Sequence, residues 1–271
     1  MRLAAPLAAA VLTTALVAPS HAASRPVALY PLGDSITFGS SGAVIVAGHR
    51  TETRTAGGYR GNLDLLLTAD GVPHTFVGSR KDNATVAQRI TGEDRHDGWP
   101  GFRIDQAAQV ARRLGGEPGV ALVMLGTNDV LQRYDPGTRY PAGRVAYGDA
   151  RQRALFVAHL TGRLQALVDD LQALHPGIRV VVATVPPLTA TGGLGPPDAV
   201  TPGYAAAVRR LVAAEQRRGQ RVELADVWSA LVVGTTVRPG DLAHDGVHPS
   251  ASGYRRMATV FAAAVERAVA Y

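Results

Sequence analysis

Cysteine is absent from the 271-residue sequence, which excludes disulfides, thiolate metal sites and a catalytic cysteine. Lysine occurs once, at Lys81, so the formal net charge of +6 comes from arginines. These arginines are scattered over separate segments without aromatic residues between them, unlike the basic and aromatic groove of a nucleic-acid-binding protein. The composition therefore predicts stability from packing alone and no nucleic-acid partner.

Long apolar runs are missing as well, except at the N-terminus, where Arg2 precedes an apolar run over residues 3–17. The run is shorter than the roughly 20 residues that span a bilayer, and Pro19 ends it. The pattern is typical of a signal peptide, and a membrane anchor is the alternative. We therefore expect a signal peptide over residues 1–22 and a secreted single domain over residues 23–271. We expect no stable insertion into a membrane.

Short apolar runs alternate with longer segments of helical spacing along the rest of the chain. The runs are unbroken, which is the pattern of parallel strands buried on both faces. We expect strands at residues 27–32, 74–78, 120–125, 179–185 and 222–224. We expect helices at residues 58–69, 103–114, 149–174, 204–218 and 253–269. The sequence thus predicts an α/β protein, a three-layer α/β/α sandwich with a five-stranded parallel sheet. Long loops are expected at residues 40–57, 132–148 and 188–203.

The first expected strand is followed directly by Gly33, Asp34 and Ser35. Ligands of such sheets bind beyond the carboxyl ends of the strands, so residues in this place are candidates for function. A serine on a sharp strand-to-helix turn lies beside backbone amides and a helix dipole that stabilise an oxyanion. The alternative is that Asp34 or Ser35 only caps a helix.

A serine hydroxyl needs an oriented histidine to become a nucleophile. Asp245 and His248 lie three residues apart in a Gly/Pro loop before the last expected helix. This spacing lets the carboxylate reach Nδ1 and leaves Nε2 to face the serine. Asp241 and His244 form a second pair at the same spacing, and a metal site built from both pairs is a further alternative. We expect no metal, because such close residues converge only in a strongly bent loop.

Two other turns offer hydrogen-bond donors for a developing negative charge. Asn128 lies in the GTND segment after the third expected strand, and its carboxamide can donate. Gly98 and Gly101 lie in the turn before the helix expected at residues 103–114, where a backbone amide at Gly101 is another donor. The alternative in both places is a plain turn, with Asn128 capping the next segment.

Four segments occur in the order of the blocks that define the SGNH (GDSL) hydrolases. They are GDSITFG at 33–39, DGWPGFRID at 97–105, GTND at 126–129 and DGVHP at 245–249. The sequence therefore resembles this family over essentially the whole chain after the N-terminal segment. The resemblance implies a flavodoxin-like fold and a serine esterase that needs no cofactor.

The resemblance also implies a role for each matching residue. Ser35 is then the nucleophile, His248 the general base and Asp245 its partner, because the second Asp-His pair lacks the Gly and Pro of the family's Asp-Gly-x-His-Pro form. The amides of Ser35 and Gly101 and the side chain of Asn128 form the oxyanion hole. Between the two glycines of block two, Gly101 is chosen because it directly precedes the helix.

A narrower resemblance is to the acetylxylan esterases of the third carbohydrate-esterase family. It depends on GYR at 58–60, FVGS at 76–79 and HDGWPG at 96–101, although Asp97 stands where that family has Glu. It implies an enzyme that deacetylates plant polysaccharide such as acetylated xylan. We expect a secreted monomer that takes small-molecule or polysaccharide esters. The alternatives are a lipase or lysophospholipase and, from another class, a non-catalytic carbohydrate-binding protein on a hydrolase scaffold.

Overall fold

The structure is a computed structural model that describes residues 25–46, 49–136, 145, 147–189 and 199–270. The expected signal peptide at residues 1–22 lies outside these residues, as do parts of the loops expected at residues 132–148 and 188–203. Within the described ranges, none of the helices combines the length and the apolar character needed to cross a membrane.

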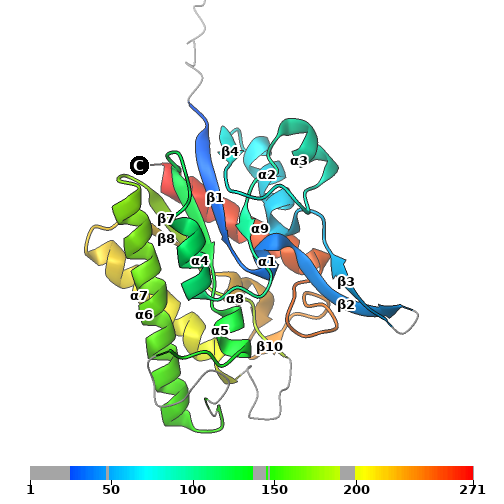
Figure 1. Cartoon of the computed structure of the whole chain (residues 1–271), viewed down its shortest axis with the longest axis vertical. Helices are drawn as coiled ribbons and strands as arrows, with labels where there is room; N and C mark the ends of the chain where they lie inside the picture. The colour runs from blue at the N-terminus through cyan, green and yellow to red at the C-terminus, as the bar shows by residue number, and fades with distance from the viewer. Residues whose placement is uncertain (1–24, 47–48, 137–144, 146, 190–198, 271) are drawn as a thin grey trace, which may run out of the picture.

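A parallel sheet forms the centre of the fold (Figure 1). Its main strands are β1 (Val27–Gly33), β4 (His74–Phe76), β6 (Val120–Met124), β7 (Arg179–Ala183) and β8 (Val222–Ala225). They pair in the order β4-β1-β6-β7-β8, and every pairing is parallel. The two-residue strand β5 (Asp97–Gly98) pairs with the carboxyl end of β1. The predicted five-stranded parallel sheet is confirmed, and β5 adds to it.

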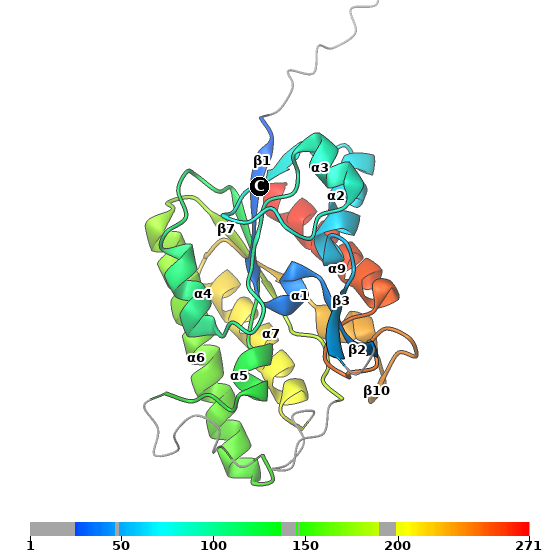
Figure 2. The ribbon, with the colours of Figure 1, turned by 45° about the vertical axis from the view of Figure 1, so that its right-hand side comes forward.

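Helices cover both faces of the sheet (Figures 1 and 2). One layer consists of α4 (Ile104–Ala111), α6 (Ala150–Leu174) and α7 (Thr201–Arg217). The other consists mainly of α2 (Gly58–Ala69) and α9 (Ala251–Val269), which pack on each other through the stacked rings of Tyr59 and Phe261, 4.3 Å between centroids. The predicted α/β/α sandwich is therefore confirmed.

Among the described residues, four short helices follow strands or loops where the sequence showed no helical periodicity, although the turn at Ser35 was expected to lead into a helix. They are α1 (Ser35–Phe38), α3 (Val86–Thr91), α5 (Thr127–Leu131) and α8 (Val227–Leu231). Each has at most six residues, which is too short for a repeat of 3.6 residues to be read. Two of them, α1 and α5, carry predicted site residues.

An antiparallel hairpin replaces most of the loop expected at residues 40–57, so that expectation is wrong. It consists of β2 (Ser40–Val46) and β3 (His49–Arg54) and projects from the body beside α1 (Figure 1). The register shifts between Ser40 and Ala43, and such a bulge breaks the alternation by which strands are recognised in a sequence. A further small hairpin joins β9 (Val232–Val233) to β10 (Thr236–Val237).

Candidate active site

Three predicted side chains converge at the carboxyl end of β1. Ser35 is the first residue of α1, and His248 and Asp245 lie in the loop before α9. The Oγ atom of Ser35 is 2.9 Å from Nε2 of His248, and Nδ1 of His248 is 2.7 Å from Oδ2 of Asp245. This is the order of contacts in a Ser-His-Asp triad: the carboxylate holds the proton on Nδ1, so Nε2 is left to accept from the serine.

The carboxylate of Asp245 is fixed by its own loop. Its Oδ1 accepts hydrogen bonds from the backbone amides of Val247 and His248, both at 3.0 Å. Burial raises the pKa of Asp245, but the hydrogen bonds from His248 and Val247 outweigh burial and hold it below its ordinary value. The group is thus ionised at neutral pH, as stabilisation of an imidazolium on His248 requires. Gly42 of the hairpin closes over it, because a Cβ there would lie 3.1 Å from Oδ2.

The second Asp-His pair is not arranged in this way. Asp241 is buried, and its Oδ2 lies 2.8 Å from Nε of Arg256, whereas His244 is exposed. Over the residues that the structure describes, no group of three or more His, Cys, Asp or Glu side chains is placed to hold a metal ion. The alternative of a metal site built from both pairs has no support in this geometry.

The helix that carries Ser35 is held at both ends by buried side chains. At its start, Oδ1 of Asp34 accepts from the amide of Ile36 at 2.9 Å, so Asp34 does cap a helix as the structural alternative proposed. Burial raises the pKa of Asp34 to about 7. At its end, the fully buried Arg60 of α2 donates to the carbonyl oxygens of Thr37 and Phe38, at 2.9 and 3.3 Å. In the sequence, Arg60 is noted only as part of the GYR segment at 58–60, because no local pattern links it to α1.

The turn before Asn128 is shaped by a tyrosine from α7. Gly126 has φ +119°, and a Cβ on it would lie 2.5 Å from the ring of Tyr204. The hydroxyl of Tyr204 donates to the carbonyl oxygen of Leu125 at 3.0 Å, and the whole side chain is buried. The turn therefore needs glycine at 126, both for its conformation and for the close approach of the ring. Asn128 follows as the second residue of α5.

The two glycines of the neighbouring turn differ in their surroundings. Gly98 is buried in β5, where a Cβ would lie 2.5 Å from the amide nitrogen of Phe38. Gly101 is exposed, has φ +82°, and a Cβ there would meet nothing within 4 Å. Gly98 is thus needed for packing against α1, whereas Gly101 leaves open space at the turn. The choice of Gly101 as an oxyanion donor stays a prediction.

Two side-chain carboxamides, from α5 and from the residue that follows it, form hydrogen bonds with the turn around Gly101. Nδ2 of Asn128 donates to the carbonyl oxygen of Phe102 at 3.1 Å, and Nε2 of Gln132 donates to that of Gly101 at 2.9 Å. The turn also contacts β1, since the amide of Trp99 donates to the carbonyl oxygen of Gly33 at 3.0 Å. The segments that carry Ser35, Gly101 and Asn128 are therefore joined by hydrogen bonds.

Asp97 holds the same turn through hydrogen bonds. It stands where the acetylxylan esterases that the sequence resembles have a glutamate. The buried carboxylate accepts from the hydroxyl of Tyr30 at 2.9 Å and from Nε1 of Trp99 at 3.3 Å. The ring of Trp99 stacks on Phe102, with centroids 5.4 Å apart, and the guanidinium of Arg80 lies over its ring at 4.4 Å. The shorter aspartate thus still fixes an aromatic turn next to Gly33.

Comparison with known proteins identifies the family of the chain. The model of the GDSL-like lipase/acylhydrolase family matches residues 32–256. The chain belongs to this family. The resemblance inferred from the four sequence blocks is therefore confirmed, and the GDSL-like chain is placed among ester hydrolases.

Similar proteins include carbohydrate esterases. A multidomain esterase of Ruminococcus flavefaciens is 26% identical over 256 residues, which cover 87% of this chain and 28% of that protein. The chain therefore spans less than a third of the length of this relative. A family 3 carbohydrate esterase of Clostridium thermocellum is 21% identical, with a TM-score of 0.65 and coverage of 91% of this chain and 98% of that one. A family 3 carbohydrate esterase of Talaromyces cellulolyticus is 23% identical, with a TM-score of 0.58 and coverage of 89% and 97%. These structural likenesses show that the GDSL-like fold is shared.

The contact between Gly126 and Tyr204 gives a test of how the Asn128 turn is held. Gly126→Ala places a Cβ against the ring at a positive φ, so we expect a loss of about 1–3 kcal/mol in unfolding free energy and a reduced kcat of ester hydrolysis. Gly162→Ala is the matched control, because Gly162 lies within α6 with no atom within 4 Å of an added Cβ. That control should gain about 0.5–1 kcal/mol and keep its kcat. A Gly126→Ala variant with wild-type stability and rate would contradict this role of the turn.

Proposed function

We propose that the protein is a serine esterase that works through an acyl-enzyme. The observation that carries the proposal is the pair of contacts at His248, 2.9 Å to Oγ of Ser35 and 2.7 Å to Oδ2 of Asp245. Oγ of Ser35 attacks the ester carbonyl carbon while Nε2 of His248 takes its proton. The tetrahedral intermediate then collapses, and His248 gives that proton to the departing alcohol. Water, deprotonated by the same His248, releases the acid and restores Ser35.

The negative charge on the carbonyl oxygen needs donors that are already in place. We assign this role to the amides of Ser35 and Gly101 and to the carboxamide of Asn128. Support comes from the hydrogen bonds between the Gly101 turn and the segment that carries Asn128, namely Asn128 to Phe102 and Gln132 to Gly101. The open space at Gly101 also supports the assignment. The mechanism uses only these side chains and amides, so we propose that no cofactor or metal takes part.

As substrate we propose an acetylated plant polysaccharide such as acetylated xylan. The similar proteins named as family 3 carbohydrate esterases support this choice. So does the composition of two segments expected as long loops, residues 132–148 and 188–203, which are rich in Gly, Pro, Thr and Arg rather than in the apolar residues of a lipid-binding trough. We further propose a monomer that is exported after cleavage near residue 22 and folds as one domain over residues 23–271.

Replacing the triad tests the mechanism. Ser35→Ala should lower kcat by a factor of about 10⁴–10⁶ without a change in melting temperature, as loss of a triad nucleophile does. His248→Ala should be nearly as damaging, since the serine then loses its general base. His244→Ala is the matched control, because this histidine is exposed and lies in the same loop. Full activity in Ser35→Ala, or a dependence on His244 and added zinc, would refute the triad.

Esters of increasing chain length test the substrate. We expect the wild-type enzyme to hydrolyse acetyl esters faster than butyryl, octanoyl and palmitoyl esters, and to release acetate from acetylated xylan, which Ser35→Ala should not do. Activity that rises with acyl length would identify a lipase instead. Binding to xylan without release of acetate would identify a carbohydrate-binding protein.

A further inference from the structure

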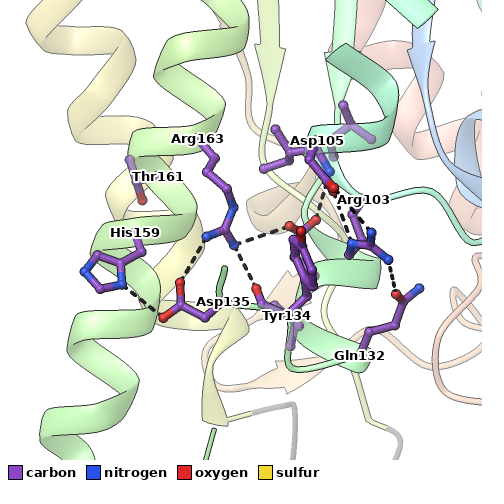
Figure 3. Close-up of polar contacts among 12 residues, drawn as sticks. Arg103, Asp105, Gln132, Tyr134, Asp135, His159, Thr161 and Arg163 are labelled. Atoms are coloured by element: carbon purple, nitrogen blue, oxygen red, sulfur yellow. Dashed lines mark hydrogen bonds and ion pairs between the residues drawn. The ribbon is translucent and has the colours of Figure 1, made fainter. Parts of the chain in front are cut away.

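A cluster of charged side chains lies beside α5, against the long helix α6 (Figure 3). Arg163 of α6 is at its centre: Nη2 is 3.3 Å from Oδ1 of Asp129, and Nη1 is 3.1 Å from Oδ1 of Asp135. Nη2 also donates to the carbonyl oxygen of Tyr134 at 3.0 Å. The other oxygen of Asp135 is 3.0 Å from Nδ1 of His159, one turn earlier on α6. None of these four side chains belongs to the proposed triad or is itself a proposed oxyanion donor.

Asp129 connects the cluster to two segments of the proposed oxyanion hole, the one that follows Gly101 and the one that carries Asn128. Its Oδ2 accepts from the amide of Ile104, the first residue of α4, at 3.1 Å. Ile104 is three residues beyond Gly101, and Asp129 itself directly follows Asn128. One carboxylate therefore joins the start of α4, which continues from the Gly101 turn, to α5, which carries Asn128.

The carboxylate of Asp129 depends on Arg163. Asp129 is fully buried, and burial raises its pKa to about 6, whereas the charge of Arg163 acts in the opposite direction. A buried carboxylate without a cation is strongly disfavoured. Arg163 is the cation that contacts it, with its side chain 18% exposed. Removing Arg163 thus destabilises the ionised carboxylate of Asp129, which accepts the hydrogen bond from the amide of Ile104.

Arg103 and Gln132 link the residues after α5 to the Gly101 turn. The guanidinium of Arg103 lies over the ring of Tyr134, 3.9 Å from its centroid, and donates to Gln132 at 2.7 Å (Figure 3). The Nε2 atom of the same Gln132 donates to the carbonyl oxygen of Gly101. The residues after α5 thus contact Arg163 on one side and the Gly101 turn on the other.

We propose that Arg163 is a positioning residue for the oxyanion hole, acting through Asp129 to fix the amide of Gly101 relative to the carboxamide of Asn128. The proposal depends on the oxyanion hole assigned under the proposed function. Such a hole accelerates the reaction because its donors are already placed before charge develops, and a displacement of about 1 Å can cost a hundredfold in rate. If Arg163 served only to neutralise a buried charge, its loss would lower stability but not kcat per folded molecule.

The test compares two arginines that each form an ion pair involving α6, one with α5 and one with the end of α4. Arg163→Met keeps much of the aliphatic stem but removes the charge. Arg112→Met is the matched control, because Arg112, just after α4, pairs with Asp170 of α6 at 2.5 Å on the exposed surface. On an acetyl ester, Arg163→Met should lower kcat about 10- to 100-fold with KM changed less than about twofold, since ground-state binding is not affected. Arg112→Met should keep the wild-type kcat.

The conservative variant Arg163→Lys adds a second readout. An ammonium group can meet Asp129, but it cannot also reach Asp135 and the carbonyl of Tyr134 in the forked geometry of a guanidinium. We therefore expect a kcat between those of the wild type and Arg163→Met. If Arg163→Met does not fold, a reduced kcat with unchanged KM in Arg163→Lys supports the role. A wild-type kcat in every folded Arg163 variant overturns it, whatever the melting temperature.

A double-mutant cycle with Asn128→Ala shows whether Arg163 acts through the hole. Asn128→Ala alone should lower kcat by about 10²–10³. In that background, Arg163→Met should cost far less than it does in the wild type, because one of the two donors whose relative position it fixes is already missing. Fully multiplicative effects would overturn the proposal. An active wild type, an inactive Ser35→Ala and a wild-type kcat in Asn128→Ala would remove Asn128 from the oxyanion hole, and this role of Arg163 with it, while leaving the triad in place.

Discussion

The hydrogen bond between Ser35 and His248 joins two residues that are 213 positions apart in the chain. It forms because the sheet is parallel and β1 lies inside it, between β4 and β6. The carboxyl end of β1 delivers Ser35 to the edge at which such sheets bind ligands. The loop before α9 returns to the same edge and brings His248 and Asp245 to it. This contact is thus a consequence of strand order, and a change that moves β1 relative to α9 would break it.

Buried polar groups hold the short helices that carry the site. Arg60 fixes the end of α1, Tyr204 shapes the turn before α5, and Asp129 joins α5 to the start of α4. Taking such groups out of water is costly unless each finds a partner. Their partners here are backbone carbonyl and amide groups of the site's own segments, together with Arg163. The polar interior therefore restricts the same turns that we assign to the nucleophile and the oxyanion hole.

The parallel sheet and the five longer helices could be predicted from the sequence, because unbroken apolar runs and helical spacing are local signals. The triad contacts could be anticipated from the Asp245–His248 spacing and from the resemblance to a known family. The β2–β3 hairpin and the short helices other than α1 could not be predicted, since they are too short or too irregular to show a period, and α1 was expected only from the turn at Ser35. The contacts of Arg60 and Arg163 with the site could not be predicted for another reason. Their partners lie on other elements, and only the folded chain brings them together.

The acyl-enzyme on Ser35 is the central claim, and trapping it is the most direct test. The wild-type protein would be mixed with an activated acetyl ester, quenched in acid during turnover, digested and analysed by peptide mass spectrometry. We expect the mass of one acetyl group on the peptide that contains Ser35, fragmentation that locates it at that residue, and its loss when turnover is complete. An acetyl group that remains on another residue, or rapid hydrolysis with no acetylated peptide at any time, would contradict the mechanism.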